Sequence, residues 1–549
     1  MKQLPFILLL LSTLCSAQKY VSPMSIRSIL SASFGELRAN HFHSGIDIRT
    51  DGVCGVKVFS VSDGYVSRIK VSPFGYGKAI YIDHPDGRTT VYAHLNEFVP
   101  QIDSIARCEQ YRKKSFSVDF NLKAGEVKVK RGQLIAYSGN TGSSGGPHLH
   151  FEVRDTKSEE PLNPLAFIPE IADRTAPTIY GIKCYALNRD AYVDNKLSEK
   201  YYSSAELAQR AIVAYGNIGI GVHATDFFDE GGRPCGVVDV KLFDNDELKF
   251  HSHIDKLNFD YTRYINSFID YAERYNTKRY VQKSFVEPNN RLNIYRKQSN
   301  IFIGDGERHT LRYELTDFAG NKKSLTFSVI GKKLDASNRA KPKGDLVEWQ
   351  KSWAKDTLGL SVVIPREAMY KDDYIYISSS KSNIFNQNVY TIGSPDMPLQ
   401  KKMTVSIPIP KQMAGLEHLF VGIVDKKNKM SYVGGQREDN MLTVKTYDMG
   451  TFVVGVDSIA PRVVSKNTRN TLNSNHFLMV GLTDDMSGID TYNCYIDGRW
   501  VLFAYDYKTA MLKAKISTLD IAKGNHTLTA IVTDACGNEA KLNWNFTLQ

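Results

Sequence analysis

Beyond its first residues, the sequence lacks any long hydrophobic run. No later segment reaches the roughly 18 apolar residues that a membrane-spanning helix requires. The sequence also lacks low-complexity tracts and any dense stripe of lysine and arginine, so nucleic acid is not an expected partner. Its 42% hydrophobic and 23% charged residues are typical of a folded chain. This composition excludes a disordered, collagen-like or polytopic membrane protein.

Cysteine is scarce as well. One of the seven cysteines is Cys15, and the other six fall two to each of three expected domains: Cys54 and Cys108, Cys184 and Cys235, Cys494 and Cys536. One disulfide in each of these domains would suit an oxidising compartment. Sequence alone does not decide between such bridges and buried free thiols, so both interpretations stay open.

The amino terminus has the pattern of a secretory signal peptide. Lys2 is followed by an apolar run at 8–11 and by small residues that end at Ala17. We therefore expect residues 1–17 to be removed and the mature protein to be exported, either to the periplasm or cell envelope or as a secreted protein. Lipid attachment at Cys15 is the alternative, although Leu14 is bulky for the position before a lipidated cysteine.

The formal net charge is +10, or +9 once Lys2 is removed with the signal peptide. An exported basic protein suits the anionic polymers of a cell envelope. The charges are spread along the chain, however, so an ordinary solvated surface is the simpler explanation.

The length of 549 residues is too great for a single core, and about 150 residues per domain predicts three to four domains. The 30 tyrosines, 26 phenylalanines and 39 glycines favour short strands and turns over long helices. We predict a mostly β protein, with a small antiparallel β-sheet domain first and several β-sandwich domains after it. The expected boundaries are 25–168, 170–332 with an insertion, 345–455 and 456–549.

Two local patterns stand out in the first domain. The runs 79–82 and 89–92 flank Pro85, Asp86 and Gly87, which is a β-hairpin signature. The polar stretch 101–123 reads as an insertion. In the second domain, the helix-like region 265–280 accounts for part of its extra length.

A weak internal repeat links the second and the last domain. Three short motifs recur in the same order: 173–177 as 457–461, 225–226 as 483–484, and 316–321 as 533–538. Both copies resemble the immunoglobulin-like sandwiches common in exported bacterial proteins. Asp484, Asp485 and Asp490 suggest a calcium site, but residues 486–488 between them read more naturally as a turn.

Histidines cluster in the first domain. His43 stands four residues before Asp47, His94 ends a predicted strand, and His148 and His150 follow the glycine-rich loop 139–146. His148 and His150 would share one strand face because side chains alternate along a strand. Two imidazoles and one carboxylate can hold zinc with a coordination position left for water, and the unligated histidines can move protons.

A single His-x-His pair is weak evidence for a metal site. His251 and His253 form another such pair, with Asp255 four residues after His251. No glycine-rich lead-in or third histidine accompanies it, so we interpret it as an ordinary strand face. His41 competes with His43 as a ligand, but it lies six residues from Asp47 and breaks the spacing.

The three histidine settings together resemble the lysostaphin-type, LytM-like zinc endopeptidases of metallopeptidase family twenty-three. The segments that carry the resemblance are 43–47, 92–95, 130–133, 138–142 and 146–153, in the family's order over about residues 35–168. The resemblance implies a small antiparallel sheet with the site in a groove, of which the loop 139–146 would be a wall. It also implies zinc ligands His43, Asp47 and His150, with His94 and His148 as the proton-handling or transition-state-stabilising pair.

The expected function is therefore that of a zinc-dependent endopeptidase that hydrolyses peptide cross-links in peptidoglycan. The alternatives are a non-catalytic, peptidase-like activator and a cell-wall-binding scaffold that recruits another hydrolase. Related regulators typically lack metal ligands, whereas here none is missing. The insertion near 101–123 and the long β tail depart from the family pattern, and neither the cleaved bond nor the oligomeric state follows from the sequence.

Overall fold

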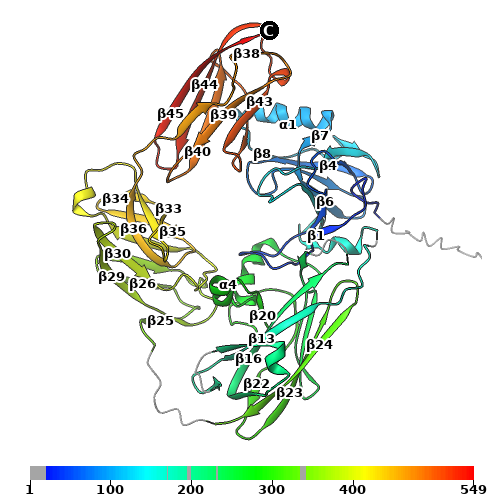
Figure 1. Cartoon of the computed structure of the whole chain (residues 1–549), viewed down its shortest axis with the longest axis vertical. Coiled ribbons are helices and arrows are strands. Elements are labelled where there is room, and N and C mark those ends of the chain that lie inside the picture. The colour runs from blue at the N-terminus through cyan, green and yellow to red at the C-terminus, as the bar shows by residue number, and fades with distance from the viewer. Residues whose placement is uncertain (1–19, 170, 195–198, 230–232, 334–341) are drawn as a thin grey trace, which may run out of the picture.

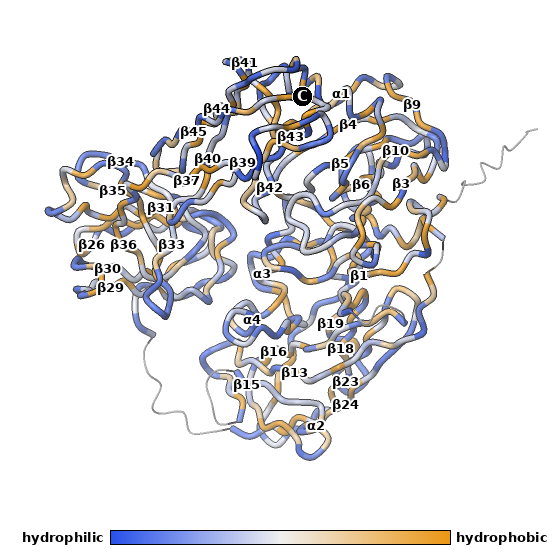
Figure 2. The backbone as a smooth tube through the Cα atoms, turned by 45° about the horizontal axis from the view of Figure 1, so that its top comes forward, coloured by the Kyte–Doolittle hydropathy of each residue, from blue (hydrophilic) through white to orange (hydrophobic). Residues whose placement is uncertain are grey.

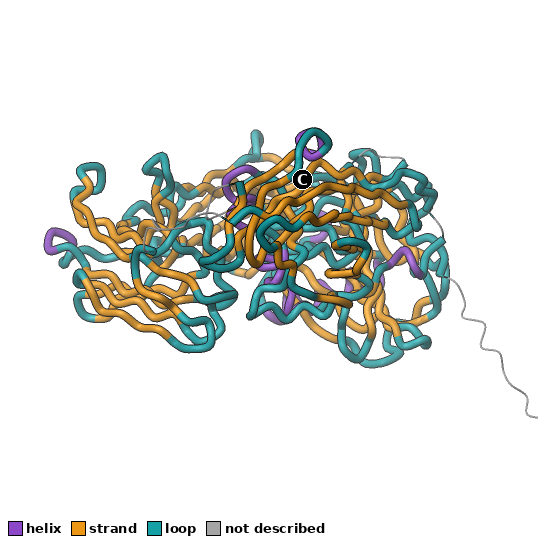
Figure 3. The backbone as a smooth tube through the Cα atoms, turned by 90° about the horizontal axis from the view of Figure 1, so that it is seen from below, coloured by secondary structure: helices purple, strands orange, loops and turns teal. Residues whose placement is uncertain are grey.

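The computed structural model describes residues 20–169, 171–194, 199–229, 233–333 and 342–549 (Figure 1). The expected signal peptide and Cys15 lie outside these residues. The predicted mostly β architecture is confirmed: 48% of the described residues are in strands and 9% are in helices, with a β-rich domain first and further β-sheet domains after it. Figure 3 shows how few segments are helical. In the described part of the chain, no helix is long and apolar enough to cross a membrane.

The first unit is built on a large antiparallel sheet, with a smaller sheet packed beside it. The smaller sheet has the order β3 (Lys57–Phe59), β10 (Leu134–Tyr137) and β7 (Glu97–Phe98). Two short strands, β9 (Lys128–Val129) and β12 (Pro161–Leu162), pair with members of the large sheet. The large sheet itself runs in the order β1 (Leu30–Ala32), β2 (Ile46–Arg49), β11 (His148–Asp155), β6 (Arg88–Leu95), β5 (Lys78–Asp83), β4 (Gly64–Val71) and β8 (Val118–Asn121).

The predicted hairpin forms the centre of the large sheet. Strands β5 and β6 pair with Ile82 opposite Thr90, and Gly87 closes the turn with a φ of +79°. Both strands are almost wholly buried because apolar residues cover both faces of the sheet. Strand β6, which carries His94, therefore lies in a buried part of the sheet.

The predicted polar insertion contains helix α1 (Pro100–Lys113) and strand β8. Pro100 suits the first helical turn, where no amide donor is needed. Lys114 ends the helix in the left-handed region, with a φ of 46°. The helix buries only Ile102, Ala106 and Gln110, so its other residues are at least partly exposed on the rim of the first unit.

The second unit is organised around one long strand, β16 (Ile212–Phe227). The helix-like region expected at 265–280 contains α3 (Ile265–Phe268) and α4 (Tyr271–Thr277). Its sheet runs in the order β15 (Glu199–Ser203), β13 (Thr178–Ala186), β16, β24 (Lys322–Gly331), β23 (Arg308–Thr316), β18 (Asp239–Asp244), β19 (Glu247–His253) and β21 (Tyr295–Gln298).

The third unit has two facing sheets around its own core. One runs in the order β26 (Trp353–Thr357), β27 (Leu360–Ile364), β31 (Met403–Pro408), β35 (Met441–Thr446) and β34 (Gln436–Glu438). The other has the order β29 (Ile377–Ser382), β30 (Gln387–Ile392), β36 (Gly450–Val456), β32 (Leu419–Val424) and β33 (Met430–Gly434).

The fourth unit also consists of two sheets with a separate core, and hydrophobic and hydrophilic stretches alternate along its strands in Figure 2. Its first sheet has the order β37 (Arg462–Ser465), β39 (Phe477–Thr483), β43 (Met511–Lys515) and β42 (Ala504–Asp506). Its second sheet has the order β38 (Thr471–Leu472), β45 (Glu539–Leu548), β44 (Gly524–Asp534), β40 (Ile489–Ile496) and β41 (Arg499–Trp500).

The fourth unit returns to the first, so that the chain closes on itself (Figure 1). Trp500 packs edge-on against Tyr111 of α1, with ring centroids 5.4 Å apart. Arg107 of the same helix donates a 2.8 Å hydrogen bond to the carbonyl oxygen of Thr518. The insertion thus supplies part of the surface on which the last unit rests.

The cysteines are not bridged. Among the described residues every cysteine is a free thiol. Cys184, Cys235 and Cys494 are buried, and burial raises the pKa of each of these thiols. Of the two interpretations left open by the sequence, the structure therefore supports free thiols over disulfide bridges.

Candidate metal centre

Three neighbouring strands bring the predicted site residues together. Strand β11 lies between β2 and β6, and His150 on β11 pairs directly with Asp47 on β2 and with Ala93 on β6. His94 follows Ala93 at the end of β6, and His43 lies in the turn that leads into β2. Residues about 100 positions apart in the chain thereby meet at one end of the sheet.

The donor atoms of His43, Asp47 and His150 converge on one point. His43 Nε2 lies 3.0 Å from Asp47 Oδ1 and 3.0 Å from His150 Nδ1. His150 Nδ1 lies 2.9 Å from the same carboxylate oxygen. All three residues are buried, and their donor atoms form one potential metal-binding group.

The second nitrogen of each histidine determines which tautomer it adopts. His43 Nδ1 lies 2.8 Å from the carbonyl oxygen of Ser33, so it donates and leaves the Nε2 lone pair for a metal. His150 Nε2 lies 2.8 Å from Glu152 Oε1, so it donates and leaves Nδ1 free. Such outer hydrogen bonds are what orients metal-ligating histidines. Two lone pairs and a carboxylate oxygen thus face each other, and this donor set fits zinc.

The electrostatics of the site favour the binding of a cation. Burial opposes ionisation of Asp47, but His43, His148 and His150 hold its pKa well below the usual range. Burial lowers the pKa of His43. Burial also works against a charged His150, yet Asp47 and Glu152 raise its pKa to about 9. The carboxylates therefore favour positive charge at the point where the donors meet.

Several supporting residues were not predicted from the sequence. Glu152 is fully buried and accepts 2.6 Å hydrogen bonds from the hydroxyls of Ser44 and Tyr76. Arg154 Nε donates to its other oxygen at 2.6 Å. Burial raises the pKa of Glu152, but Arg154 and His150 outweigh this and keep it ionised. The only sequence signal for these two residues was the two-residue period of a strand: Glu152 stands two residues after His150, and Arg154 stands two residues after Glu152.

Arg38 is a further residue that sequence reasoning missed. Its Nη2 lies 3.1 Å from Asp47 Oδ2, the oxygen that does not face the histidines, and its Nε lies 3.4 Å from Glu36. The guanidinium thus orients the carboxylate from outside the donor cluster. No motif around position 38 indicated this contact.

His94 and His148 stand beside the donor cluster as a pair, with ring centroids 4.8 Å apart. His94 Nδ1 lies 2.9 Å from the carbonyl oxygen of Thr141, and His148 Nδ1 lies 2.8 Å from that of Gly146, so each ring can keep its proton on Nδ1. His148 Nε2 is 3.5 Å from Asp47 Oδ1. Burial, with His150 and His148 nearby, lowers the pKa of His94 to about 3, so this ring is neutral.

The site opens into a cleft of about 450 Å³. The glycine-rich loop 143–147 lines one side of the cleft, as predicted for a groove wall, and Arg38 and Arg49 are among the residues that line it elsewhere. Arg233 of the second unit also lines this cleft. The first two units therefore both shape the surroundings of the site.

The competing candidates lie elsewhere. His41 is exposed and contacts the carbonyl oxygen of Ala39 rather than the donor cluster. His251 and His253 lie on β19, but the carboxylate between them is Asp239, at 2.7 and 2.9 Å, and not Asp255. Asp239 lies on the neighbouring strand β18, so sequence spacing could not reveal it.

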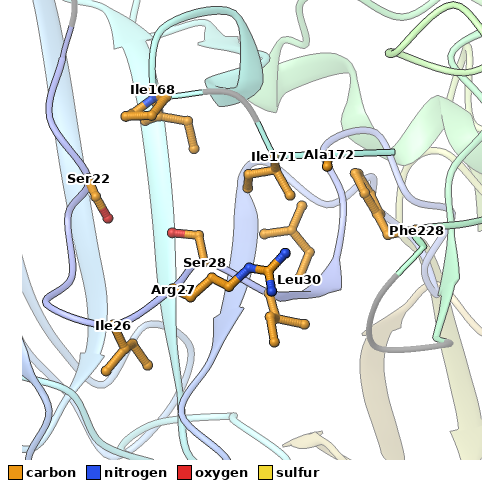
Figure 4. Close-up of a pocket in the computed structure, with 11 residues that line it drawn as sticks. Ser22, Ile26, Arg27, Ser28, Leu30, Ile168, Ile171, Ala172 and Phe228 are labelled. Carbon is orange, nitrogen blue, oxygen red and sulfur yellow. The ribbon is translucent and has the colours of Figure 1, made fainter. Parts of the chain in front are cut away.

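A second cavity, of about 290 Å³, lies between the start of the first unit and the segment 168–172 (Figure 4). Ile26, Leu30, Ile168 and Phe228 are among the residues around it. Among the residues that the structure describes around it there is no histidine and no carboxylate, so these residues offer none of the groups that hold a metal or move a proton.

Two segments of the chain match models of known protein families. The model of Peptidase family M23 matches residues 41–110 and 115–164. The model of the Zu5-like domain matches residues 344–457. The first match contains all five predicted site residues.

Individual relatives match the same N-terminal region. DD-carboxypeptidase/endopeptidase Mpg of Neisseria meningitidis is 32% identical over 139 residues, which are 24% of this chain and 26% of the relative. Peptidoglycan DD-endopeptidase ShyB of Vibrio cholerae is 34% identical over 111 residues, 20% of each chain. Glycyl-glycine endopeptidase ALE-1 of Staphylococcus capitis is 26% identical over 166 residues, 30% of this chain and 37% of the relative. The chain thus spans between 20% and 37% of the length of these relatives.

Proposed function

Because the N-terminal unit is a peptidase domain of family M23, we propose that this protein is a zinc-dependent endopeptidase that hydrolyses peptide cross-links of peptidoglycan. The observation that carries the proposal is the convergence of His43 Nε2, Asp47 Oδ1 and His150 Nδ1 within about 3 Å of one another. In each histidine the other nitrogen is already engaged, so the free lone pairs point at one place.

The three donor residues would hold the zinc ion. When bound there, zinc supplies a water of lowered pKa and polarises the scissile carbonyl. Glu152 holds the His150 ring in the ligating tautomer, and Arg38 orients the Asp47 carboxylate. These contacts fix the ligands before substrate binds, which preorganises the site.

His94 and His148 are the residues we assign to proton transfer. Each holds a proton on Nδ1 against a backbone carbonyl and presents Nε2 as an acceptor. Amide hydrolysis requires a proton to be taken from the attacking water and one to be given to the leaving amine. The two Nε2 atoms, beside the donor cluster, are in position to move these protons or to stabilise the charge that develops.

The cross-link we propose as substrate is of the DD type. The relatives named as DD-endopeptidases are 32% and 34% identical to this domain, whereas the relative named as a glycyl-glycine endopeptidase is 26% identical. Such a substrate supports a location outside the cytoplasm, in the periplasm or cell envelope, to which the signal peptide expected from the sequence would direct the chain.

The test combines metal analysis with digestion of purified sacculi. We expect about one zinc per catalytic site and soluble muropeptides whose masses show cleavage of a DD cross-link. His150→Ala should lose both the zinc and the activity, whereas His41→Ala, a histidine outside the cluster, should keep both. Zinc-free protein, or undiminished activity in His150→Ala, would refute the proposal; cleaved glycyl bridges would refute the DD assignment alone.

A further inference from the structure

Two clusters of three aspartates lie outside the peptidase domain, one in each copy of the internal repeat. Within each cluster, carboxylate oxygens of the three residues lie within 4.8 Å of one another. The first cluster is in the second unit and the other in the fourth. Their members are Asp173, Asp226 and Asp317, and Asp457, Asp484 and Asp534.

The clusters occupy equivalent places in the two units. Asp173 and Asp457 precede the first strands, β13 and β37. Asp226 lies near the end of β16, and Asp484 directly follows β39. Asp317 follows β23, while Asp534 is the last residue of β44. The three repeated sequence motifs each contribute one carboxylate, so the repeat preserves a three-dimensional group as well as a sequence pattern.

One asparagine holds the third carboxylate in each copy. Asn321 Nδ2 donates to Asp317 Oδ2 at 2.8 Å and to the carbonyl oxygen of Asp173 at 3.2 Å. Asn538 Nδ2 donates to Asp534 Oδ2 at 2.8 Å and to the carbonyl oxygen of Asp457 at 2.7 Å. The same bonds thus tie the end of the unit to its beginning in both copies.

The first cluster contains a carboxylate oxygen without a partner. Asp226 is only 3% exposed, and among the described residues its buried Oδ1 has no hydrogen-bond donor. Asp317 beside it is 4% exposed. A buried acceptor among negative charges is costly unless a cation compensates it.

We propose that each cluster binds one Ca²⁺ ion. The donors are carboxylate oxygens without any thiolate or imidazole, which suits a hard cation and not zinc. Three carboxylates on separate segments offer the flexible oxygen set that Ca²⁺ accepts more readily than Mg²⁺. This inference concerns the β units and does not depend on the peptidase activity.

Both ions would lie at junctions between units. Asp173 follows the peptidase domain directly, and Phe228 and Cys235, which come soon after Asp226, pack into the core of the first unit. Figure 4 shows Ala172 close to Phe228 at this junction. Arg233 in the same segment lines the cleft of the metal centre. A cation held by Asp173 and Asp226 would therefore stiffen the attachment of the second unit beside the active site.

The second cluster adjoins the Zu5-like domain. His418 of that domain contacts the carbonyl oxygen of Cys536 at 2.7 Å, and the Tyr432 hydroxyl donates to that of Ala535 at 3.2 Å. Both contacted residues directly follow Asp534. Bound Ca²⁺ would keep this turn in the shape that the third unit contacts.

The decisive experiment counts the ions. The zinc-loaded full-length chain is dialysed to equilibrium against radioactive Ca²⁺, and we expect two ions per chain. Asp226→Asn and Asp534→Asn should each bind one, and the double variant none. Asp490→Asn, which changes an exposed aspartate of the fourth unit, should still bind two. No bound Ca²⁺ in the wild type, or unchanged binding in the double variant, would overturn the proposal.

Calorimetry distinguishes an ion site from a merely structural cluster. At a Ca²⁺ concentration about a hundredfold above Kd, the transition of the second unit should rise by roughly 5–10 °C. Without Ca²⁺, Asp226→Asn should melt no lower than the wild type because one of three like charges is gone, and Ca²⁺ should no longer raise its transition. The proposed site would be contradicted if Ca²⁺ still raised the transition of Asp226→Asn, or if Ca²⁺ did not raise the transition of the wild type.

Discussion

At the metal centre, each ligand is oriented by a neighbour that does not itself contact the metal position. Glu152 holds His150, the Ser33 carbonyl holds His43, and Arg38 holds Asp47. Ligands constrained in this way lose little entropy when a metal binds. The supporting residues should therefore matter almost as much for zinc affinity as the ligands do.

Glu152→Gln tests this support. Without the carboxylate, the charged acceptor for His150 Nε2–H is lost, and we expect zinc affinity to fall about 10- to 100-fold. Arg154 would also lose its buried partner, so the variant should be less stable by about 3–5 kcal/mol. Competition with a zinc chelator measures the affinity. Glu97→Gln, an exposed change on β7, is the control, and equal affinity of the two variants would contradict the prediction.

His148→Ala separates proton transfer from metal binding. We expect kcat to fall about 10²- to 10⁴-fold, the usual contribution of a general acid or base, while zinc content stays at the wild-type level. The measurement pairs the rate of muropeptide release with metal analysis of the same sample. A variant that loses its zinc would show that His148 is a ligand instead.

His84 gives the first unit a pH-dependent stability. It is 6% exposed, with the Asp63 carbonyl and the Thr90 hydroxyl at 2.8 and 2.7 Å, and burial lowers its pKa. The folded state thus takes up this proton less readily than the unfolded state, whose pKa is about 6.5. Stability from this residue is complete above about pH 6.5 and falls as the pH drops below that value, by at most about 1.4 kcal/mol per pH unit.

Calorimetry of the wild type and His84→Gln between pH 5 and 8 checks the sign. The variant should be less stable than the wild type at pH 8, and the difference should shrink towards pH 5. A difference that grows as the pH falls would mean that His84 is stabilised in its charged form.

Among the elements, the loop that forms the cleft wall depends on a close backbone approach. Gly142 has a φ of +69°, and a Cβ on it would lie 2.3 Å from the carbonyl oxygen of Gly75. Gly142→Ala should therefore cost about 1–3 kcal/mol and reduce activity, since Thr141 and Gly146 in this loop hold His94 and His148. Thermal unfolding and sacculus digestion measure the two effects.

Gly145→Ala is the matched control for this change. It lies in the same loop, but nothing stands within 4 Å of its Cβ position. It should behave like the wild type, and a similar loss in both variants would point to a general sensitivity of the loop.

The elements differ in how well the sequence predicts them. The β5–β6 hairpin was predicted because Pro85, Asp86 and Gly87 separate two apolar runs, a local signal. Helix α1 was recognised only as a polar insertion, since it buries few side chains and lacks a continuous apolar stripe. The pairing of β2 with β11, about 100 residues apart, has no local signal at all.

In the whole molecule, the fourth unit contacts the wall of the cleft. Lys508 Nζ donates to the carbonyl oxygens of Asn140 and Ser144, the latter at 3.2 Å, and Tyr507 packs on Phe74 with ring centroids 4.9 Å apart. These contacts hold a large unit beside the groove and should hinder a bulky polymer more than a small peptide.

Removal of these contacts should therefore change substrate preference. In a Tyr507→Ala, Lys508→Ala double variant, we expect digestion of intact sacculi to rise several-fold relative to soluble cross-linked muropeptides. Lys523→Ala, an exposed lysine of the same unit, serves as the control. An unchanged ratio of the two rates would show that the contact does not limit access.

The sequence by itself determined what depends on neighbours in the chain: the mostly β composition, the hairpin turn, and the spacings that set His43 against Asp47 and His148 beside His150. Such features follow from the two-residue period of strands and from turn chemistry. Only the tertiary structure decided which distant residues complete the sites, such as Arg38 and Tyr76 at the metal centre and the three aspartates of each repeat. It also decided where the fourth unit rests, because contacts between separately folded units depend on packed surfaces that no local pattern records.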